Sequence, residues 1–479
     1  MKLSPFIRPD NILINNTLNF LNRSKIYTNS LNWEDNQFGL LWAFNLNYFD
    51  FLNQINIEKD EGLALIKDFI FNYDDNSVAK HSYTISLRGI NWIKFVSIHN
   101  IQDIQINSHL FNQYQLLVRR PEYPLMGNHL LENGLSLLFG AVYFNNKYLM
   151  KKSKSILLKE LEEQILEDGA HFELSTMYHI ILLNRLLDCI NLLSNNSSPE
   201  YSDLEILLRE KASLMVSWMN NMTLSNGILS DFNDSTSGVA PSVNDIMNYA
   251  KTLEICPVKE LRLGSSGYRF YRKNTTEFIF DVGNIGPDYQ PAHAHSDTFN
   301  FEWYISSKPI IVDTGTSTYE NNEIRRFERS TRAHNTIEVD GGEQSEIWHS
   351  FRVGRRAKTK IIMESENHLI AVHNGYDHIG AVHQREYLFQ DDKIEIKDSI
   401  KSAKNHKCRF YIHFAPGIDY TLKENQVAGS DFFIEFENNF SFIEEGLYNK
   451  AIGFNVRKQA KYLCVTFENS LTTKLSVAK

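Results

Sequence analysis

The sequence is poor in cysteine: four cysteines are scattered over 479 residues, at Cys189, Cys256, Cys408 and Cys464. Their spacing fits neither a zinc-finger pattern nor the dense disulfide framework of small secreted domains. We therefore expect buried or free thiols, which give no reason to place the protein in an oxidising compartment.

Long hydrophobic runs are also missing. A membrane-spanning helix needs about 18 or more consecutive apolar residues, and no segment approaches that length. The first residues, MKLSPFIRPDNILINN, lack the continuous apolar core of a secretory signal. These absences predict no membrane insertion and a cytoplasmic location for the sequence as written. A periplasmic protein already trimmed of its signal would look the same.

An excess of positive charge is absent too. The formal net charge is -9, which argues against a general nucleic-acid-binding protein. With 42% hydrophobic and 22% charged residues, the composition is that of an ordinary folded protein. A chain of 479 residues is longer than one hydrophobic core usually organises, so we expect at least two domains.

The first half of the chain has helical periodicity. Up to about residue 256, apolar residues recur at helical spacing, for example in residues 181–193 and 204–219. Short clusters of Asn, Asp, Ser and Gly separate such segments. No fixed-period repeat is visible, which disfavours a repeat solenoid. The pattern predicts a helical domain over residues 1–258.

The second half changes to period two. After residue 264, every second residue from Phe299 to Ile305 is apolar or aromatic and would share one face of a strand. An Asp391-Asp392 pair between two alternating runs predicts a hairpin turn. Because no helical segments intervene, antiparallel sheets packed as a sandwich are expected over residues 259–479. The predicted class is α+β with more than one domain.

Two histidines one residue apart stand out in QPAHAHSDTFNFEWYISSKPIIVDTG. In an extended strand, His293 and His295 would point to the same side. Asp313 ends the next apolar run, which could pair with FNFEWYIS as a hairpin, and His334 opens a third strand. Two imidazoles and one carboxylate would form a three-ligand zinc site with an open position. The alternative is that the histidines are hydrogen-bonded within a polar loop.

Two polar insertions interrupt the apolar pattern of the helical half. In PLMGNHLLENGL, Asn128 can cap a helix whose first turn carries His129, with Glu132 on the same face. Capping explains Asn128 but not the pairing of His129 with Glu132. In EDGAHFELSTMYHI, Ser175 is a natural N-cap that places Tyr178 in the first helical turn, where half-buried packing is the alternative to a functional role.

Arginines cluster in the second half, near the histidines. A solvated, salt-bridged surface is the ordinary explanation of such clusters. Guanidinium groups also bind carboxylate and sulfate oxygens well, so an anionic sugar polymer is a fitting ligand, with Arg329 and Arg332 as candidate contacts. The clusters comprise Arg325, Arg326, Arg329, Arg332, Arg352, Arg355 and Arg356.

Five fragments together carry a family resemblance. GNHLLEN, DGAHFELSTMYH, PAHAHSDTFNFE, IVDTGTSTYE and RSTRAHNTIEVDGGEQSE, in this order and spacing, resemble the heparinase II/III family of polysaccharide lyases, which includes oligoalginate lyases. The resemblance covers most of the chain. It implies an N-terminal (α/α) toroid, a C-terminal antiparallel β-sandwich, and an acidic polysaccharide or oligosaccharide as substrate.

The resemblance also implies roles for individual residues. Asn128 and His129 match a pair that neutralises the uronate carboxylate, Tyr178 matches a catalytic base, acid or both, and His293 belongs to the same centre. The remaining matches are one structural or site-organising zinc ion on His295, Asp313 and His334, and positions near the substrate carboxylate at Arg88 and Glu132.

The chemistry expected of such a protein is β-elimination. It removes the proton on carbon 5 of a uronic acid, and neutralising the adjacent carboxylate stabilises the enolate-like transition state. Because a free tyrosine has a pKa of about 10, we expect nearby imidazolium or arginine charge to lower the pKa of Tyr178.

Two other functions remain open at this stage. LWAFNLNYFDFL is similar to a version of the family associated with bacterial capsule or exopolysaccharide assembly, which would suit a non-catalytic glycan-binding or polymer-handling protein. A zinc-dependent glycan hydrolase, with the open metal position activating water, is the other alternative. The sequence leaves the oligomeric state open, a dimer included.

Overall fold

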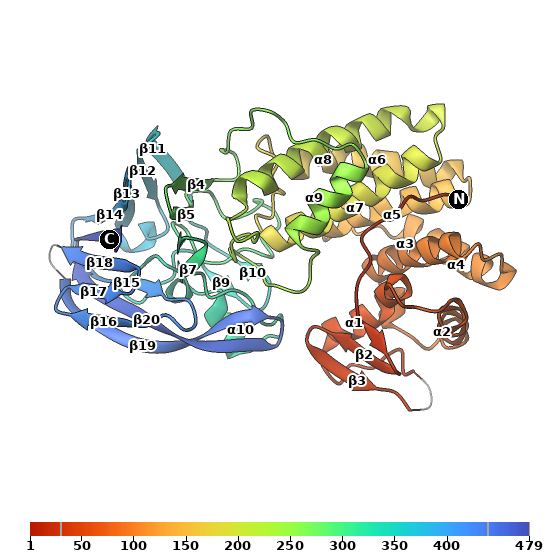
Figure 1. Cartoon of the computed structure of the whole chain (residues 1–479), viewed down its shortest axis with the longest axis horizontal. Helices are drawn as coiled ribbons and strands as arrows, with labels where there is room; N and C mark the ends of the chain where they lie inside the picture. Colours follow the sequence, from red (N-terminus) through yellow and green to blue (C-terminus); the bar gives the residue numbers. More distant parts are fainter. Residues whose placement is uncertain (29–30, 438–439, 479) are drawn as a thin grey trace. The chain divides into compact units, whose positions relative to one another are not determined.

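The structure, a computed structural model, describes residues 1–28, 31–437 and 440–478 (Figure 1). Contacts within the chain group it into two compact units. The first unit comprises residues 1–165, 180–217 and 240–258, and the second comprises residues 166–179, 218–239 and 259–479. Two segments from the helical half of the sequence therefore belong to the second unit.

Helices form most of the first unit and follow a small antiparallel sheet (Figure 1). The sheet consists of β1 (Leu13–Ile14), β2 (Thr17–Phe20) and β3 (Arg23–Ile26). The helices are α1 (Leu40–Tyr48), α2 (Lys59–Phe71), α3 (Ser82–Ile98), α4 (Ile104–Arg119), α5 (Gly127–Tyr143), α6 (Lys147–Gln164), α7 (Thr176–Asn195), α8 (Ser202–Met222) and α9 (Val243–Thr252). The apolar segments predicted as helices, residues 181–193 and 204–219, lie inside α7 and α8, so that prediction is confirmed.

Side-chain caps and close packing explain where these helices begin and how they meet. The Asp103 carboxylate accepts two backbone N–H groups at the start of α4, and Asn146 does the same for α6. Helix α5 packs against both α3 and α6. A side chain at Gly134 of α5 would come within 2.8 Å of Ile156 on α6, so glycine permits this close approach.

The second unit is built mainly of strands and also contains the first turn of α7, the end of α8 and the short helix α10 (Glu323–Glu328). The strands are β4 (Tyr268–Lys273), β5 (Thr276–Asp281), β6 (Phe301–Ile305), β7 (Lys308–Ile311), β8 (Ile337–Val339), β9 (Ile347–Trp348), β10 (Arg352–Val353), β11 (Thr359–Ser365), β12 (His368–His373), β13 (Ala381–Gln390), β14 (Lys393–Ser402), β15 (Lys407–His413), β16 (Tyr420–Lys423), β17 (Gln426–Gly429), β18 (Phe432–Glu437), β19 (Phe440–Gly453), β20 (Val456–Glu468) and β21 (Ser470–Val477).

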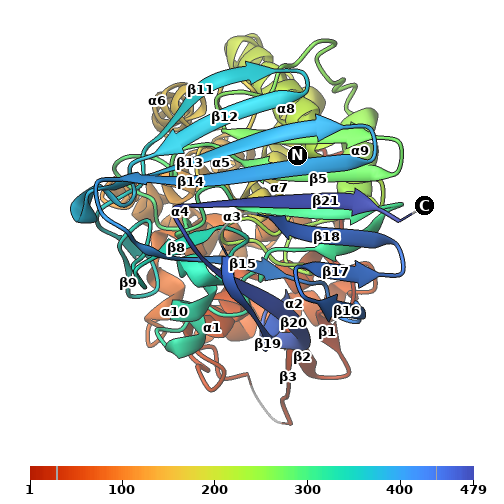
Figure 2. The same ribbon diagram turned by 90° about the vertical axis from the view of Figure 1, so that its left-hand side faces the viewer.

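These strands form an antiparallel sandwich. One layer is an eight-stranded sheet in the order β11-β12-β13-β14-β21-β18-β17-β16, whose strands lie side by side in Figure 2. The sheets β4-β5-β6-β7 and β19-β20-β15-β8 form the other layer, linked by a 3.0 Å hydrogen bond from the Val312 N–H to the His413 carbonyl. The ring of Phe280 on β5 lies 4.5 Å from that of Tyr387 on β13, so the layers share one core. The predicted sandwich is confirmed.

Two local predictions within the sandwich have different outcomes. Gln390 pairs with Lys393, so Asp391-Asp392 forms the predicted two-residue turn between β13 and β14. Strand β6, in contrast, begins only at Phe301. Phe299 is buried but has a φ of 69°, outside strand geometry, so it does not share the strand face predicted for it.

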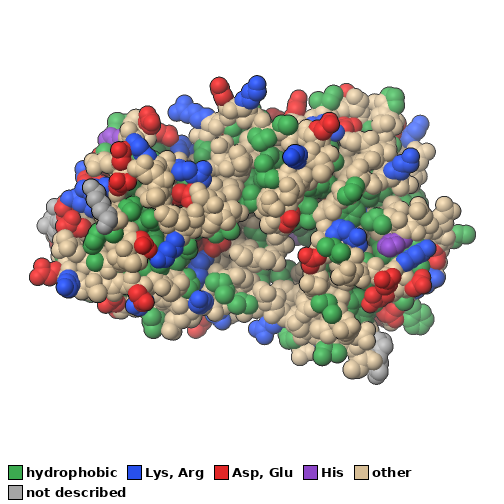
Figure 3. All heavy atoms as spheres, viewed as in Figure 1, with side chains coloured by type: hydrophobic (Ala, Val, Ile, Leu, Met, Phe, Trp, Pro, Cys, Tyr) green, Lys and Arg blue, Asp and Glu red, His purple; other side chains and the backbone are tan. Residues whose placement is uncertain are grey.

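The four cysteines are free thiols, and Cys256 alone among them is exposed. Within the described residues, no helix combines the length and apolarity needed to cross a membrane. On the face shown in Figure 3, acidic and basic side chains are interspersed.

Candidate active site

Asp234 is the shared partner of both histidines of the His-x-His motif. Its Oδ2 lies 2.9 Å from Nδ1 of His293, and its Oδ1 lies 2.9 Å from Nε2 of His295. The backbone reinforces this contact, because the Asp234 N–H donates to the His293 carbonyl at 3.1 Å. One carboxylate thereby fixes the orientation of two imidazole rings.

Arg325, on α10, keeps Asp234 ionised although both groups are buried. Its guanidinium donates to both Asp234 oxygens, with a 2.8 Å bond from Nη2 to Oδ2, and also to the Ser350 carbonyl. Burial alone would raise the pKa of Asp234, but the Arg325 charge and the hydrogen bonds from His293 and His295 hold it well below its usual value. The site therefore contains a buried anion aimed at two histidines.

Tyr178 lies directly against His293. The ring centroids are 4.0 Å apart, and the Tyr319 hydroxyl donates to the Tyr178 hydroxyl at 3.3 Å. Ser175 accepts the Tyr178 backbone N–H at 3.2 Å and donates to the Asp234 carbonyl at 2.7 Å. Ser175 is therefore the N-cap predicted from the sequence, and it ties the first turn of α7 to the Asp234 segment.

The electrostatic environment of Tyr178 differs from the expectation. Burial raises the pKa of its phenol well above 10, and Tyr319, Asp234 and Glu173 raise it further. We expected positive charge to lower this pKa, but no cationic group is among its main causes, and the buried Arg325 guanidinium is paired with Asp234. Tyr178 is consequently a neutral phenol at physiological pH, a state suited to donating a proton.

The His-x-His segment is a loop and not a strand. The predicted strand geometry is therefore not the reason why His293 and His295 face the same site. Residues 291–300 lie between β5 and β6 without strand pairing. His293 and His295 nevertheless meet, because both bind Asp234 and because the His295 N–H donates to Asn233 Oδ1 at 3.0 Å. The convergence depends on a residue from the other half of the sequence.

The residues expected to bind zinc lie close together. β6 and β7 form the predicted hairpin, and Asp313, just after it, contacts Nδ1 of His334 at 2.7 Å. The rings of His295 and His334 are 5.3 Å apart. His334 precedes β8 by three residues instead of opening it.

The fit of this cluster to a zinc ion is partial. His295 Nδ1 and His334 Nε2 are buried without a hydrogen-bond partner, which is costly unless something binds them. Burial lowers the pKa of His295 to about 4, so its ring is neutral, as a metal ligand must be. However, no three His, Cys, Asp or Glu side chains among the described residues are arranged around a common metal position. The expected three-ligand arrangement is not formed, because Asp313 is engaged by His334 Nδ1.

The motif residues of the first unit have partners other than those expected. Helix α5 begins at Gly127 after Met126, so Asn128 lies within the first turn and is not the cap. His129 Nδ1 contacts Glu122 Oε1 at 3.2 Å. The predicted pairing of His129 with Glu132 is wrong, because the Glu132 carboxylate lies 2.8 Å from Arg185 Nε.

Arg88 and Glu132 are fully buried in the first unit. The Arg88 guanidinium donates to Gln113 and to the carbonyls of Asn47 and Ala79, so its donors are used within the fold. Burial raises the pKa of Glu132, although Arg185 opposes the rise. Both groups thus support the helix packing, and their expected position near a substrate carboxylate stays a prediction.

Arg329 and Arg332 also differ from each other. Arg329 is buried and donates to the backbone carbonyls of Ala294 and His349, so it holds the His-x-His loop and does not offer its charge to a ligand. Arg332 is exposed, with its guanidinium 5.6 Å from the Phe327 ring. Arg332 is the more accessible of the two, and the substrate contacts expected of both stay predictions.

Sequence reasoning missed Asp234 and Tyr319. Asp234 lies in LSNGILSDFNDSTSG, whose turn-forming residues were interpreted as a spacer between helices. Tyr319 lies in the quoted fragment IVDTGTSTYE, but no spacing rule connects it to Tyr178, from which it is separated by 141 positions. The available sequence signal was an acidic residue beside Asn233 in a segment of turn-forming residues. Only the fold shows that this acid, Asp234, is buried against two histidines.

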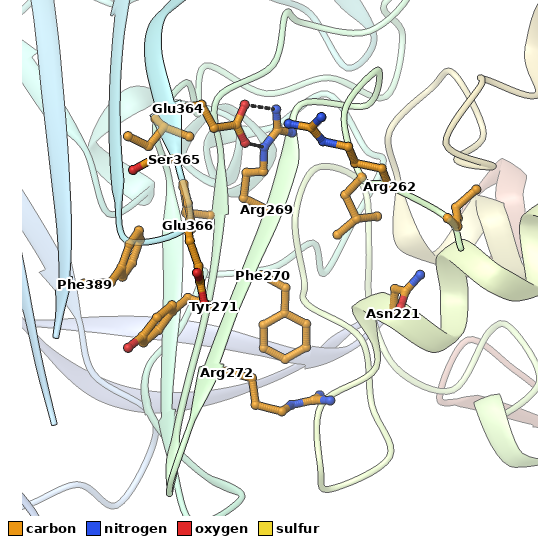
Figure 4. A pocket seen from close by; sticks show the side chains of 14 residues that line it. Asn221, Arg262, Arg269, Phe270, Tyr271, Arg272, Glu364, Ser365, Glu366 and Phe389 are labelled. Atoms are coloured by element: carbon orange, nitrogen blue, oxygen red, sulfur yellow. Dashed lines mark hydrogen bonds and ion pairs between the residues drawn. The ribbon is translucent and has the colours of Figure 1, made fainter. Parts of the chain in front are cut away.

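A separate hollow of the second unit, with a volume of about 540 Å³, is lined by arginines and aromatic rings (Figure 4). Arg269 is paired with Glu364 at 2.6 Å, and Arg272 lies 2.9 Å from Glu277. The remaining lining charges, Arg262 and Glu366, have opposite signs. The lining thus carries three arginines and two glutamates, and Glu277 beside Arg272 offsets the one excess positive charge, so the hollow presents little net charge to an acidic polymer.

Comparison with known families identifies the class of protein that this fold and site define. The model for the heparinase II/III N-terminus matches residues 80–261, and the heparinase II/III-like C-terminal model matches residues 259–478. The chain belongs to the heparinase II/III family.

Among curated proteins, the chain is similar to two heparin-sulfate lyases. It is 24% identical over 245 residues to that of Pedobacter heparinus, covering 46% of this chain and 37% of the relative. It is 22% identical over 351 residues to that of Bacteroides stercoris, covering 68% and 49%. The matches thus span less than half the length of these relatives.

Solved structures share the fold. A crystal structure of heparinase III has a TM-score of 0.73 at 17% identity, covering 94% of this chain and 79% of that chain. The chondroitin AC lyase of Streptomyces coelicolor A3 has a TM-score of 0.52 at 8% identity, covering 93% and 75%. These similarities agree with a helical (α/α) toroid followed by a β-sandwich, the predicted fold class.

Proposed function

We propose that this protein is a polysaccharide lyase that cleaves a uronic-acid-containing polymer by β-elimination. The observation that carries the proposal is the contact of the Tyr178 ring with the His293 ring, with Asp234 bound to His293 Nδ1. A potential proton donor and a potential proton acceptor are thereby held side by side, and a buried carboxylate orients the acceptor.

The protonation states favour a division of labour. Asp234 accepts the Nδ1 proton of His293, and we assign the removal of the proton from carbon 5 to Nε2 of the same ring, which lies 3.8 Å from Glu173 Oε2. The electrons of that C–H bond form a double bond between carbons 4 and 5 as the bond from carbon 4 to the glycosidic oxygen breaks. Tyr178, neutral because its pKa is raised, donates its proton to the departing oxygen. The proton on His293 then leaves through solvent while Tyr178 is reprotonated.

Charge on the substrate carboxylate must be offset during this reaction. We assign that role to Asn128 and His129, on the motif resemblance, with Arg332 as a further contact to the acidic chain. A neutralised carboxylate accepts the charge that develops when carbon 5 loses its proton. The names of the relatives make heparan sulfate and chondroitin sulfate the first substrates to test, with alginate and hyaluronan beside them.

We also propose one zinc ion, held by His295 and His334, with Asp313 as third ligand only if its carboxylate turns from His334 Nδ1 toward the metal. Two unpartnered buried ring nitrogens support this assignment. Bound zinc would supply a rigid link between the His-x-His loop and the segment that carries His334. The proton transfers assigned to Tyr178 and His293 do not require it.

The proposal is tested by mixing the protein with this panel of acidic glycans and following the ultraviolet absorbance of unsaturated uronyl ends. Absorbance that grows with time, and that is lost on replacing Tyr178 with phenylalanine, supports the lyase. Saturable binding of a polymer without new chain ends would instead establish the non-catalytic, polymer-handling alternative. Cleavage without unsaturated ends would favour the hydrolase.

A further inference from the structure

A fully buried network in the core of the sandwich is used neither by the proposed chemistry nor by the zinc cluster. Arg385 on β13 and Asp398 on β14 occupy directly paired positions of the hairpin. Arg385 Nε lies 2.7 Å from Asp398 Oδ1, and Nη2 lies 3.0 Å from Oδ2. The third nitrogen of the guanidinium, Nη1, does not bind Asp398 but donates to backbone carbonyls.

Two histidines extend the network with every hydrogen assigned. The Gly375 N–H donates to His373 Nδ1 at 3.0 Å, so the His373 proton lies on Nε2 and is donated to His383 Nδ1 at 2.9 Å. His383 must then carry its own proton on Nε2, which lies 2.6 Å from Asp398 Oδ1. Both rings are neutral, and His383 shares Asp398 Oδ1 with Arg385 Nε, so the two histidines help to fix the carboxylate that orients Arg385.

The free arm of Arg385 reaches two loops of the candidate active site. Nη1 donates to the Phe299 carbonyl at 2.7 Å and to the Asn335 carbonyl at 3.1 Å. Phe299 ends the loop that carries His293 and His295, and Asn335 directly follows His334. One guanidinium therefore joins the backbones of the two segments that deliver these three histidines.

The network also holds Phe299 in a conformation that phenylalanine rarely adopts. Its φ of 69° lies in the left-handed region, which is strained for a residue with a large side chain. The Phe299 ring lies 5.0 Å from His373 and 5.2 Å from His383, and Tyr387 donates to the same carbonyl at 3.4 Å. Contacts on both the ring and the carbonyl thus maintain the strained end of the loop.

A purely structural role would not require this arrangement. Buried ion pairs contribute little net stability compared with well-packed apolar residues of similar size. An apolar replacement of Arg385 and Asp398 could fill the core, but it would leave the Phe299 and Asn335 carbonyls without Nη1 as donor. Apolar residues cannot replace the Arg385 Nη1 group that donates to the Phe299 and Asn335 carbonyls.

We propose that Arg385, oriented by Asp398, His383 and His373, is a positioning residue that sets the His-x-His loop and His334 for catalysis. This inference rests on the proposed lyase function for its kinetic consequence, but its structural content is independent of activity.

The test compares Arg385→Lys with Arg409→Gln. Lysine keeps the charge beside Asp398 but lacks the fork that serves Asp398 and two carbonyls together. Arg409 is the control, because its guanidinium pairs across the strands with Glu338 in the same unit and not with the Phe299 or Asn335 carbonyl. We expect kcat of Arg385→Lys to fall about 10- to 100-fold while KM changes less than about threefold, since misplaced catalytic groups lower turnover more than binding.

A second readout separates this inference from the proposed function. Long-range ¹H–¹⁵N spectra report the tautomers and environments of histidine rings in protein without substrate. We expect shifted ring signals for His293, His295 and His334 in Arg385→Lys, and unchanged signals in Arg409→Gln. If no glycan is cleaved even by the unaltered protein, the lyase proposal fails, but these spectra still decide the positioning role.

Unchanged ring signals in folded Arg385→Lys would overturn the inference, as would a kcat loss equal to that of Arg409→Gln. If Arg385→Lys does not fold, Tyr387→Phe takes its place, because it removes the weaker donor to the Phe299 carbonyl and leaves the Arg385 guanidinium present. A smaller shift confined to the His293 and His295 signals then supports the inference, and an unchanged spectrum contradicts it.

Discussion

At the scale of single residues, the candidate site depends on which groups carry protons. Tyr178 is a neutral phenol because burial and neighbouring acids raise its pKa. Asp234 is an anion because Arg325 and two histidines hold its pKa low despite burial. Residue type and motif identified Tyr178 and His293 from the sequence. Neither could show that Asp234 binds the rings of both His293 and His295.

Tyr178→Phe removes the proposed proton donor without changing the ring that packs against His293. We expect kcat to fall about 10²- to 10⁴-fold, the usual contribution of general acid–base catalysis. The assay is the rate of unsaturated uronyl formation. Tyr271→Phe is the control, since its hydroxyl serves only the Gln390 carbonyl; full activity in Tyr178→Phe would contradict the assignment.

Asp234→Asn keeps the shape of the side chain but introduces an N–H₂ group toward partners that are themselves donors. His293 and His295 lose the carboxylate that accepts hydrogen bonds from their rings. We therefore expect kcat to fall about 10²- to 10⁴-fold, as for comparable carboxylate–histidine pairs. The unpaired Arg325 should lower the free energy of unfolding by about 3–5 kcal/mol. Kinetics and urea unfolding measure the two effects.

Asp340→Asn serves as the control for Asp234→Asn. Asp340 also pairs with a histidine, His406, at 2.7 Å, but its side chain is largely exposed. Retention of normal turnover by Asp234→Asn would show that His293 does not need the carboxylate.

At the scale of elements, the hairpins follow from the sequence more directly than the loops do. The turn at Asp391-Asp392 and the β6–β7 hairpin were predictable, because strand periodicity and turn residues are local signals. The loop of residues 291–300 was not, because its shape depends on Asn233, Asp234 and Arg385, which lie far away along the chain. The same dependence explains why Phe299 fits the alternating pattern but lies outside the strand.

Strand β6 contains a buried acid whose protonation should affect stability. Burial raises the pKa of Glu302 to about 8, with Asp231 adding to the rise and Lys450 opposing it. Because the folded-state pKa exceeds the unfolded value of about 4.3, the folded protein holds a proton that the unfolded chain releases. Its contribution is fully present below the unfolded pKa and is lost as pH rises through about 8.

Glu302→Gln, which mimics the protonated acid, should therefore be less sensitive to alkaline pH than the unaltered protein. The thermal midpoints of the two proteins should separate between pH 5 and pH 9, in favour of the variant. Thermal unfolding across this range is the measurement. Parallel curves for both proteins would mean that Glu302 does not hold a proton in the folded state.

At the scale of the whole molecule, the change from period 3.6 to period two predicted the order of helical and β-rich parts. Periodicity could not show that residues 166–179 and 218–239 belong with the sandwich, because their membership depends on contacts and not on local pattern. These two segments contain Tyr178 and Asp234, so the candidate site draws on both halves of the sequence.

The zinc proposal predicts a property of the purified protein. We expect about one zinc per chain by elemental analysis, because structural zinc sites bind tightly. His334→Ala should lower the zinc content and the thermal midpoint together, while Cys256→Ser, at an exposed thiol, should change neither. Full stability of the unaltered protein after exhaustive chelation, with no metal released, would contradict a zinc ion in this cluster.

The most direct test of the proposed reaction is the mass spectrum of the products formed from a cleaved uronate polymer. Elimination divides the chain without adding atoms, so oligosaccharide products carrying an unsaturated end have masses equal to whole polymer repeats. Hydrolysis would add one water to each product. We predict the unsaturated masses; a product series consisting only of the hydrated masses would contradict the proposed reaction.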